Sequence, residues 1–200
     1  MSESEIQSFI DIPESYQEYI ETIFRLSVKR DLGKIKQITN IAIANYMDIK
    51  SSSVTNMLRK LSKKNLIRWK PRSKDIKLTP LGAKIGRKIV FNHVIMAIFL
   101  KNTLGIDDNE IIHKLACELE HHMKDPIMNA FKRIMGKKAI KDIEKKIDEG
   151  LDPEELDKVN IQVLPTPERI LNEFGKEFIN SYPDYKSAFL KEKENFLERY

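Results

Sequence analysis

Four residues near the middle of the chain have side chains that bind transition metals, and their spacing brings them together. Cys117 lies four residues after His113 and three before Glu120, and His121 follows directly. These steps of three and four residues place all four on one face of a helix. Burying a thiol, a carboxylate and two imidazoles without partners would cost several kcal/mol, and a bound cation removes that cost. The donor set suits Fe2+, Co2+, Ni2+ or Zn2+, with Mn2+ less favoured by the sulfur.

The alternative to a metal site is a buried polar network in which Cys117 is a small core residue. It is the only cysteine, so it forms no internal disulfide. Glu118 and His121 also make a Glu-x-x-His, as do Glu110 and His113, but both motifs fall on one predicted helix, whereas a di-iron helical bundle needs them on two different helices. The sequence has no His-Glu-x-x-His, no Gly-rich phosphate loop and no Gly-x-Ser-x-Gly. We therefore do not expect an enzyme.

The charge of the chain is concentrated in one segment. The net charge is +5, but residues 29–88 contain 17 Lys and Arg against three Asp, which gives this segment +14 and the remainder −9. A strongly basic block beside an acidic remainder is typical of a polyanion-binding module joined to a different domain. A solvated, lysine-rich surface is the alternative, and charge alone does not decide between them.

The basic block has the sequence pattern of a winged helix. Apolar residues of 14–29 recur at helical spacing, Asn40 is placed to cap a short second helix, and a third helix starts at Ser51. Residues 66–70 and 75–78 alternate between apolar and polar, with turn residues between them, and predict a small basic hairpin. Two helices joined by a tight turn and followed by such a hairpin form a winged helix-turn-helix, whose second helix enters the major groove of double-stranded DNA.

Polar side chains of this module are suited to DNA contact. Hydroxyls at the start of the third helix can meet phosphates together with the backbone N–H groups there. Asn56 and Arg59 are long enough to reach base edges, and the basic residues near them suit phosphates. A serine at a helix start is commonly only a cap, so the prediction depends on the hairpin and the charge as well. The predicted DNA-binding residues are Ser51, Ser52, Ser53, Thr55, Asn56, Arg59, Lys63, Arg72 and Lys74.

The rest of the chain is expected to be helical, which makes the fold mainly α with a small β-hairpin wing. Thr79-Pro80 is a good start for a long helix that carries His93 and ends near Gly105. Further helices are expected over 107–124 and 126–135, with two more helix starts at Asp152-Pro153 and Thr166-Pro167. At 200 residues and 41% apolar composition, the chain is long enough for one or two compact domains.

Neither a secretory leader nor a membrane span is expected. The first twenty residues lack a charged-then-apolar pattern, and no uncharged run reaches eighteen residues. We therefore expect a cytoplasmic protein with no membrane partner.

The order of these features resembles the DtxR/MntR family of iron- and manganese-dependent repressors. The resemblance covers about residues 13–136, and its motifs occur in the order and at the spacing of the family. The matching stretches are Glu18 to Phe24, Ser52-Ser53-Val54-Thr55, Leu78-Thr79-Pro80-Leu81-Gly82 and Cys117-Glu118-Leu119-Glu120-His121. The resemblance implies a homodimer whose helical second domain binds a divalent metal and thereby prepares the DNA-binding domains for their operator.

The resemblance also implies a primary metal site formed by Glu18, Cys117, Glu120 and His121. Glu18 stands where iron-type members have methionine and manganese-type members have aspartate, whereas Cys117 is the iron-type residue. The expected metal is accordingly Fe2+ or Mn2+.

A second site is implied less completely. His93 and His113 match two ligands of the iron-type ancillary site, but Ala97 stands where a carboxylate is expected one turn after His93. Glu21 matches a second-site ligand of the manganese-type members and can compensate. Whether each subunit binds one metal ion or two remains open.

Three segments are therefore expected. Residues 1–78 form the winged helix-turn-helix domain, 79–136 the metal-binding and dimerisation domain, and 137–200 a helical extension. The expected function is a metal-dependent DNA-binding regulator that represses metal-homeostasis genes. The main alternative is a winged-helix regulator that needs no metal. A more distant alternative is a helical metalloprotein in which the basic block only aids solubility.

Overall fold

The computed structural model describes residues 12–71, 73, 75–150 and 190. These residues form seven helices and one two-stranded hairpin, so the predicted fold class is confirmed. The elements are α2 (Glu14–Asp31), α3 (Asn40–Tyr46), α4 (Ser51–Lys63), β1 (Ile67–Arg68), β2 (Lys77–Leu78), α5 (Pro80–Asn102), α6 (Asn109–Glu120), α7 (Asp125–Met135) and α8 (Lys137–Asp148). The helix starts predicted at Asp152 and Thr166 lie outside the described residues.

Helices α2, α3 and α4 and the hairpin share one hydrophobic core. Ile20 and Ile23 of α2 are fully buried beside Leu58 and Leu61 of α4. The cap of α3 differs from the prediction, because Oγ1 of Thr39 accepts the hydrogen bond from the backbone N of Ala42. Asn40 is the first residue of the helix, and its side chain donates to Oγ1 of Thr55 at 2.6 Å instead.

The hairpin is short and is attached to the helices on both sides. Ile67 pairs with Leu78 and Arg68 with Lys77 in antiparallel register. The backbone N of Ile76 donates to the carbonyl of Ile38 at 2.9 Å, which ties the returning strand to the segment before α3. The hairpin therefore keeps a fixed position relative to α3 and α4, as a wing must.

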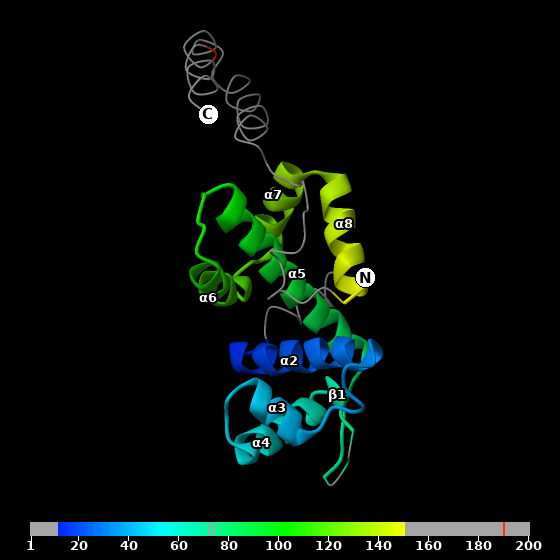
Figure 1. Cartoon of the computed structure of the whole chain (residues 1–200). Helices are drawn as coiled ribbons and strands as arrows, with labels where there is room; N and C mark the ends of the chain where they lie inside the picture. The colour runs from blue at the N-terminus through cyan, green and yellow to red at the C-terminus, as the bar shows by residue number, and fades with distance from the viewer. Residues whose placement is uncertain (1–11, 72, 74, 151–189, 191–200) are drawn as a thin grey trace.

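Helix α5 connects the two halves of the molecule. It begins at a Thr79 cap, whose Oγ1 accepts from the backbone N of Gly82 at 3.1 Å. Farther along, a Cβ added to Gly86 would lie 2.6 Å from Cβ of Phe24, so this glycine lets α5 and α2 approach closely. In Figure 1, α2 lies between the α3–α4–hairpin group and helices α6 to α8, and α5 passes from one group to the other.

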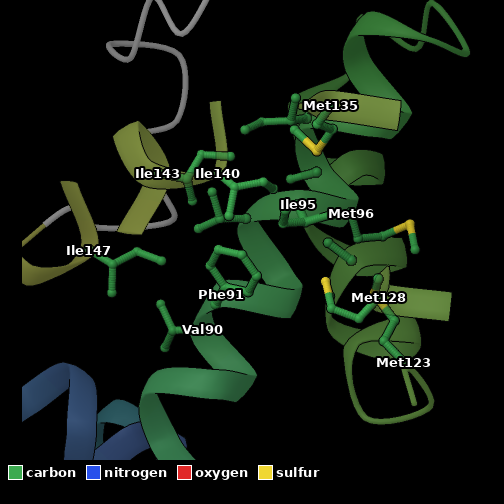
Figure 2. Packing of buried hydrophobic residues seen from close by; sticks show 14 of the residues in the cluster. Val90, Phe91, Ile95, Met96, Met123, Met128, Met135, Ile140, Ile143 and Ile147 are labelled. Atoms are coloured by element: carbon green, nitrogen blue, oxygen red, sulfur yellow. The ribbon is translucent and has the colours of Figure 1, made fainter. Parts of the chain in front are cut away.

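The second core surrounds the remainder of α5. Val90, Phe91 and Ile95 of α5 point toward Ile140 and Ile143 of α8 (Figure 2). Methionines 123, 128 and 135 cover another side of the same cluster. The predicted boundary at residue 136 thus falls between α7 and α8, although α8 packs in the same core as α5.

None of the described helices combines the length and the apolar character needed to cross a membrane.

Candidate metal centre

Two groups of side chains that could hold a metal ion lie where α2, α5 and α6 meet. We call them the thiol cluster, His93, His113 and Cys117, and the carboxylate cluster, Glu21, Glu120 and His121. Within each cluster, one ligand atom from every member lies within 4.8 Å of the others. Each cluster combines residues from two helices, because α5 contributes His93 to the first and α2 contributes Glu21 to the second.

The thiol cluster is built on one turn of α6. His113 and Cys117 are four residues apart, and Nε2 of His113 lies 3.7 Å from Sγ of Cys117. Nδ1 of His93, which reaches in from α5, lies 3.8 Å from the same sulfur. His93 is fully buried, whereas His113 is exposed, so the cluster runs from the interior to the surface.

The carboxylate cluster lies at the C-terminal end of α6. Glu120 is the last residue of that helix and only 1% of it is exposed. Oε1 of Glu120 lies 3.4 Å from Nε2 of His121, and Glu21 is 9% exposed. Two carboxyl groups thus share a buried position, where ionising both is costly without a cation.

His93 and Glu120 join the two clusters. Nδ1 of His93 lies 2.7 Å from Oε2 of Glu120, and both side chains are buried. Burial, and then the charge of Glu21, raise the pKa of Glu120, while burial and then the charge of Arg25 lower the pKa of His93. The contact is therefore a hydrogen bond between neutral groups in the metal-free protein rather than an ion pair.

The residues present fit a divalent cation. Nε2 of His93 is buried and has no hydrogen-bond partner among the described residues. Glu120 is held in its neutral form by its surroundings, as expected where a positive charge is needed for ionisation. Imidazole, thiol and carboxyl groups converging around such positions are the donors that transition metals prefer.

Gln17 of α2 orients His121. Nε2 of Gln17 donates to the carbonyl of Ile12 at 2.8 Å, so its Oε1 faces Nδ1 of His121 at 3.2 Å and must accept from it. His121 consequently carries its proton on Nδ1 and turns the lone pair of Nε2 toward Glu120. This hydrogen bond spans 104 positions of sequence and links α2 to the residue after α6.

Arg25, one turn after Glu21, is also part of this region. Its Nε donates to Oε1 of Glu21 at 2.8 Å, and 8% of the residue is exposed. Burial lowers the pKa of Arg25, but the charges of Glu21, Tyr46 and Glu120 and the hydrogen bond to Glu21 together outweigh this, and the pKa ends above its usual value. A permanent positive charge thus lies beside the carboxylate cluster.

The predicted DNA-binding residues that the structure describes gather on α4. Ser51, Ser52 and Ser53 form its exposed first turn, which has no capping side chain and no acidic residue. Such a turn leaves backbone N–H groups and the positive helix end available to a phosphate. Asn56, Arg59 and Lys63 are exposed as well.

Two features of this surface could not be anticipated from composition. Nη1 of Arg59 donates to Oδ1 of Asn56 at 3.0 Å, so the two residues expected to reach bases are paired with each other. Oγ1 of Thr55 accepts from Asn40 and donates to the carbonyl of Ser51 at 3.0 Å. Thr55 therefore holds α3 against α4. Arg72 and Lys74 lie outside the described residues.

Comparison with known proteins agrees with this architecture. Residues 11–74 match the model of the iron dependent repressor N-terminal DNA-binding domain, and 79–148 match that of the iron dependent repressor metal-binding and dimerisation domain. An HTH-type transcriptional regulator of Methanocaldococcus jannaschii is 34% identical over 124 residues, which are 62% of this chain and 94% of the relative. The chain belongs to the iron-dependent repressor family.

A second relative and a solved structure show weaker similarity. The HTH-type transcriptional regulator MntR of Geobacillus thermodenitrificans is 31% identical over 120 residues, or 60% of this chain and 77% of MntR. The solved manganese regulator SloR is 24% identical with a TM-score of 0.47, and the match covers 67% of this chain. This chain spans about half the length of SloR, 54%. Members of the family are metal-dependent transcriptional repressors and not enzymes.

The grouping of the ligands in this family member differs from the prediction. Cys117 was expected with Glu18, Glu120 and His121, but it lies with His93 and His113, and Glu21 takes its place beside Glu120. Helix α6 ends at Glu120, earlier than the predicted residue 124, and His121 is its C-cap residue, with αR backbone angles. Glu18 is exposed and belongs to neither cluster, although its charge contributes to the raised pKa of Glu120.

Gln17 and Arg25 were not predicted from the sequence. Both are on the stripe of α2 that contains Glu21, four residues before it and four after it. A row of three polar residues at this spacing, on a helix whose neighbouring positions are apolar core, is the signal that could have identified them.

Proposed function

We propose that this chain is an Fe2+- or Mn2+-dependent repressor that binds operator DNA as a homodimer and controls metal-homeostasis genes. The observation that carries the proposal is the composition of the carboxylate cluster. Glu21 comes from α2, which packs in the core of the DNA-binding domain, whereas Glu120 and His121 come from the metal-binding domain. Occupation of this cluster therefore affects both domains at once.

The two clusters favour different cations. Imidazole and thiol donors in the thiol cluster suit Fe2+ or Zn2+, whereas carboxylate oxygens and one imidazole suit Mn2+ or Fe2+. Fe2+ is the cation that both donor sets accept, and one or two ions per subunit are consistent with the spacing of the clusters. A bound divalent cation supplies the positive charge that allows Glu21 and Glu120 to be ionised together. Glu18, exposed nearby, is available as an additional ligand from α2.

The residues of the centre control how firmly α2 is held. In the metal-free protein, α2 reaches α6 through hydrogen bonds such as that between Gln17 and His121. Ligation by Glu21, Glu120 and His121 adds direct connections between the same helices. A DNA-binding domain that is already fixed loses less conformational freedom when it binds its operator, and so binds it more tightly.

DNA contact is assigned to α4 and the wing. Ser51, Ser52 and Ser53 suit phosphates at the helix start, Asn56 and Arg59 suit base edges, and Lys63, Arg72 and Lys74 suit phosphates. Each phosphate that is neutralised should steepen the salt dependence by about 0.9 in log–log slope.

The rival function is a winged-helix regulator whose His, Cys and Glu residues form a satisfied buried network. Nε2 of His93, which has no hydrogen-bond partner among the described residues, argues against this metal-independent function, because a polar network that serves only stability leaves few buried groups without partners.

The test is DNA binding titrated with metals. A duplex is selected from a random library by the protein in the presence of Mn2+, or of Fe2+ under nitrogen, and its affinity is measured with each metal and with chelator. We expect the affinity to rise with metal in wild type and to stay low in the double variant Cys117→Ala, His121→Ala. Equal affinities for both proteins under all conditions would show a regulator that needs no metal.

A further inference from the structure

The side chain of Arg25 is unusual among the charged groups of the metal centre, because it is a buried cation. Only 8% of its side chain is exposed, and both of its contacts to Glu21, through Nε and Nη2, fall on the same carboxylate oxygen, Oε1. Its Nη1 is buried and has no hydrogen-bond partner among the described residues. A buried guanidinium that serves only stability normally has its N–H groups satisfied and engages both oxygens of its partner.

The charge of Arg25 extends beyond its direct partner. Glu120 on α6 attracts Arg25, and Arg25 disfavours a positive charge on His93 of α5. One guanidinium thus acts on members of both clusters. In the metal-free protein, in which Glu120 is neutral, Arg25 compensates the negative charge of Glu21.

A divalent metal ion in the carboxylate cluster would compete with Arg25 for the carboxylate of Glu21. It needs the carboxylate of Glu21, which already neutralises Arg25, and it must lie close to a like charge in a position with little water to screen the repulsion. An arginine does not lose its proton at any relevant pH. The repulsion between Arg25 and the metal ion is therefore relieved only if the Arg25 side chain moves away or gives up part of its hydrogen bonding to Glu21.

We infer that Arg25 is a resident cation that competes with the divalent metal ion for Glu21, and so sets the metal affinity of the carboxylate cluster below what its ligands alone would give. The inference rests on the proposed function, since it requires that the cluster binds a metal. In physical terms, Arg25 sets the metal concentration at which the repressor responds. Its presence also stabilises the empty centre, so that the metal-free protein stays folded.

The test compares Arg25→Gln and Arg25→Met with wild type in calorimetric titrations with Mn2+, and with Fe2+ under nitrogen. Both substitutions remove the charge, and the expected result is metal binding about 10- to 100-fold tighter than in wild type. Arg25→Lys keeps the charge and is expected to bind metal as weakly as wild type. Arg87→Gln is the matched control, because Arg87 pairs with Asp148 of α8 and not with a residue of the centre.

Thermal denaturation provides a second measurement that a merely structural arginine would not reproduce. Loss of Arg25 is expected to lower the melting temperature of the metal-free protein and to enlarge the increase that metal produces. The dependence of that increase on metal concentration also gives the affinity if a variant is too unstable for calorimetry at room temperature.

The outcomes separate this inference from the proposed function. Metal binding by wild type with equal or weaker binding by both neutral variants would overturn the role of Arg25 and leave the metal-dependent function standing. Absence of metal binding in wild type and in every Arg25 variant would overturn both.

Discussion

At the scale of single residues, the proposed metal centre contains side chains that orient the candidate ligands as well as the candidate ligands themselves. Gln17 shows this most simply. One amide anchors itself on the carbonyl of Ile12 and thereby fixes which nitrogen of His121 carries the proton. Partners of this kind hold a ligand in its productive orientation.

Replacing Gln17 by Leu removes the acceptor for His121 while keeping most of the buried volume. We expect metal affinity to fall about 10- to 100-fold, the usual effect of losing a partner of a metal-binding histidine. Calorimetric titration with Mn2+ measures it. Gln17→Glu retains an acceptor and serves as the control, and unchanged affinity in Gln17→Leu would show that His121 needs no such orientation.

On the proposed DNA-binding surface of α4, Arg59 and Asn56 are hydrogen-bonded to each other. To contact bases, both side chains would have to exchange this hydrogen bond for one to DNA. Arg59→Ala should weaken binding of a selected duplex by about 1–3 kcal/mol and relax the preference at one base position. Lys63→Ala is the comparison, because loss of a phosphate contact should weaken binding to all duplexes alike and lower the salt slope by about one. Equal effects of the two substitutions on all sequences would contradict a base-reading role for Arg59.

The sequence predicted which ligands are neighbours along one helix, but not which are neighbours across helices. His113 and Cys117 follow from four-residue spacing alone. That Cys117 meets His93, while Glu120 meets Glu21, depends on how far α2 and α5 are displaced along α6. No periodicity within a single segment contains that information.

At the scale of elements, the crossing of α2 and α5 positions the centre. Gly86 permits the crossing, since any side chain there would meet Cβ of Phe24 and the carbonyl of Ile20. The prediction from sequence found both helices, because their apolar residues recur at helical spacing. The close contact between α2 and α5 at Gly86 could not be predicted, because a glycine in a helix does not indicate which residues pack on it.

Gly86→Ala is expected to destabilise the fold. Overpacking costs about 1–3 kcal/mol, from which the better helix propensity of alanine recovers about 1 kcal/mol. Denaturant unfolding measures the difference, with Lys84→Ala at an exposed position of α5 as the control. A Gly86→Ala protein as stable as wild type would show that α2 and α5 are not closely packed at this point.

Helix α8 is joined to α5 by the ion pair between Arg87 and Asp148, whose atoms lie 2.7 Å apart. The hydrogen bond from Arg87 lowers the pKa of Asp148 below its usual value of 3.8. A lowered pKa contributes stability that is fully present above pH 3.8 and is lost as the pH falls through the pKa of the folded protein.

Asp148→Asn should therefore reduce the free energy of unfolding at pH 7 by a small amount, about 0.2–1 kcal/mol for a pair this exposed. The variant and wild type should become equally stable in strong acid. Unfolding measured at a series of pH values checks this, with Asp142→Asn on the exposed side of α8 as the control. A difference that persists in acid would assign the effect to packing.

At the scale of the whole molecule, two domains with separate cores meet at one set of polar residues. The sequence showed this division through the +14 segment and the cluster of histidines. It could not show that α2, which lies in the first domain by sequence, also contributes Glu21 to the candidate metal centre. That arrangement is what allows metal to act on DNA binding in the proposed mechanism.

The most direct test of this account is the metal dependence of DNA binding in Glu21→Gln. This change removes the α2 member of the carboxylate cluster and leaves the thiol cluster intact. Glu14→Gln, at the exposed start of the same helix, is the matched control. We expect the ratio of duplex affinity with Mn2+ to that with chelator to fall close to one in Glu21→Gln and to stay high in Glu14→Gln. A ratio in Glu21→Gln as high as that of wild type would contradict the account, because metal would then act on DNA binding without the carboxylate of Glu21.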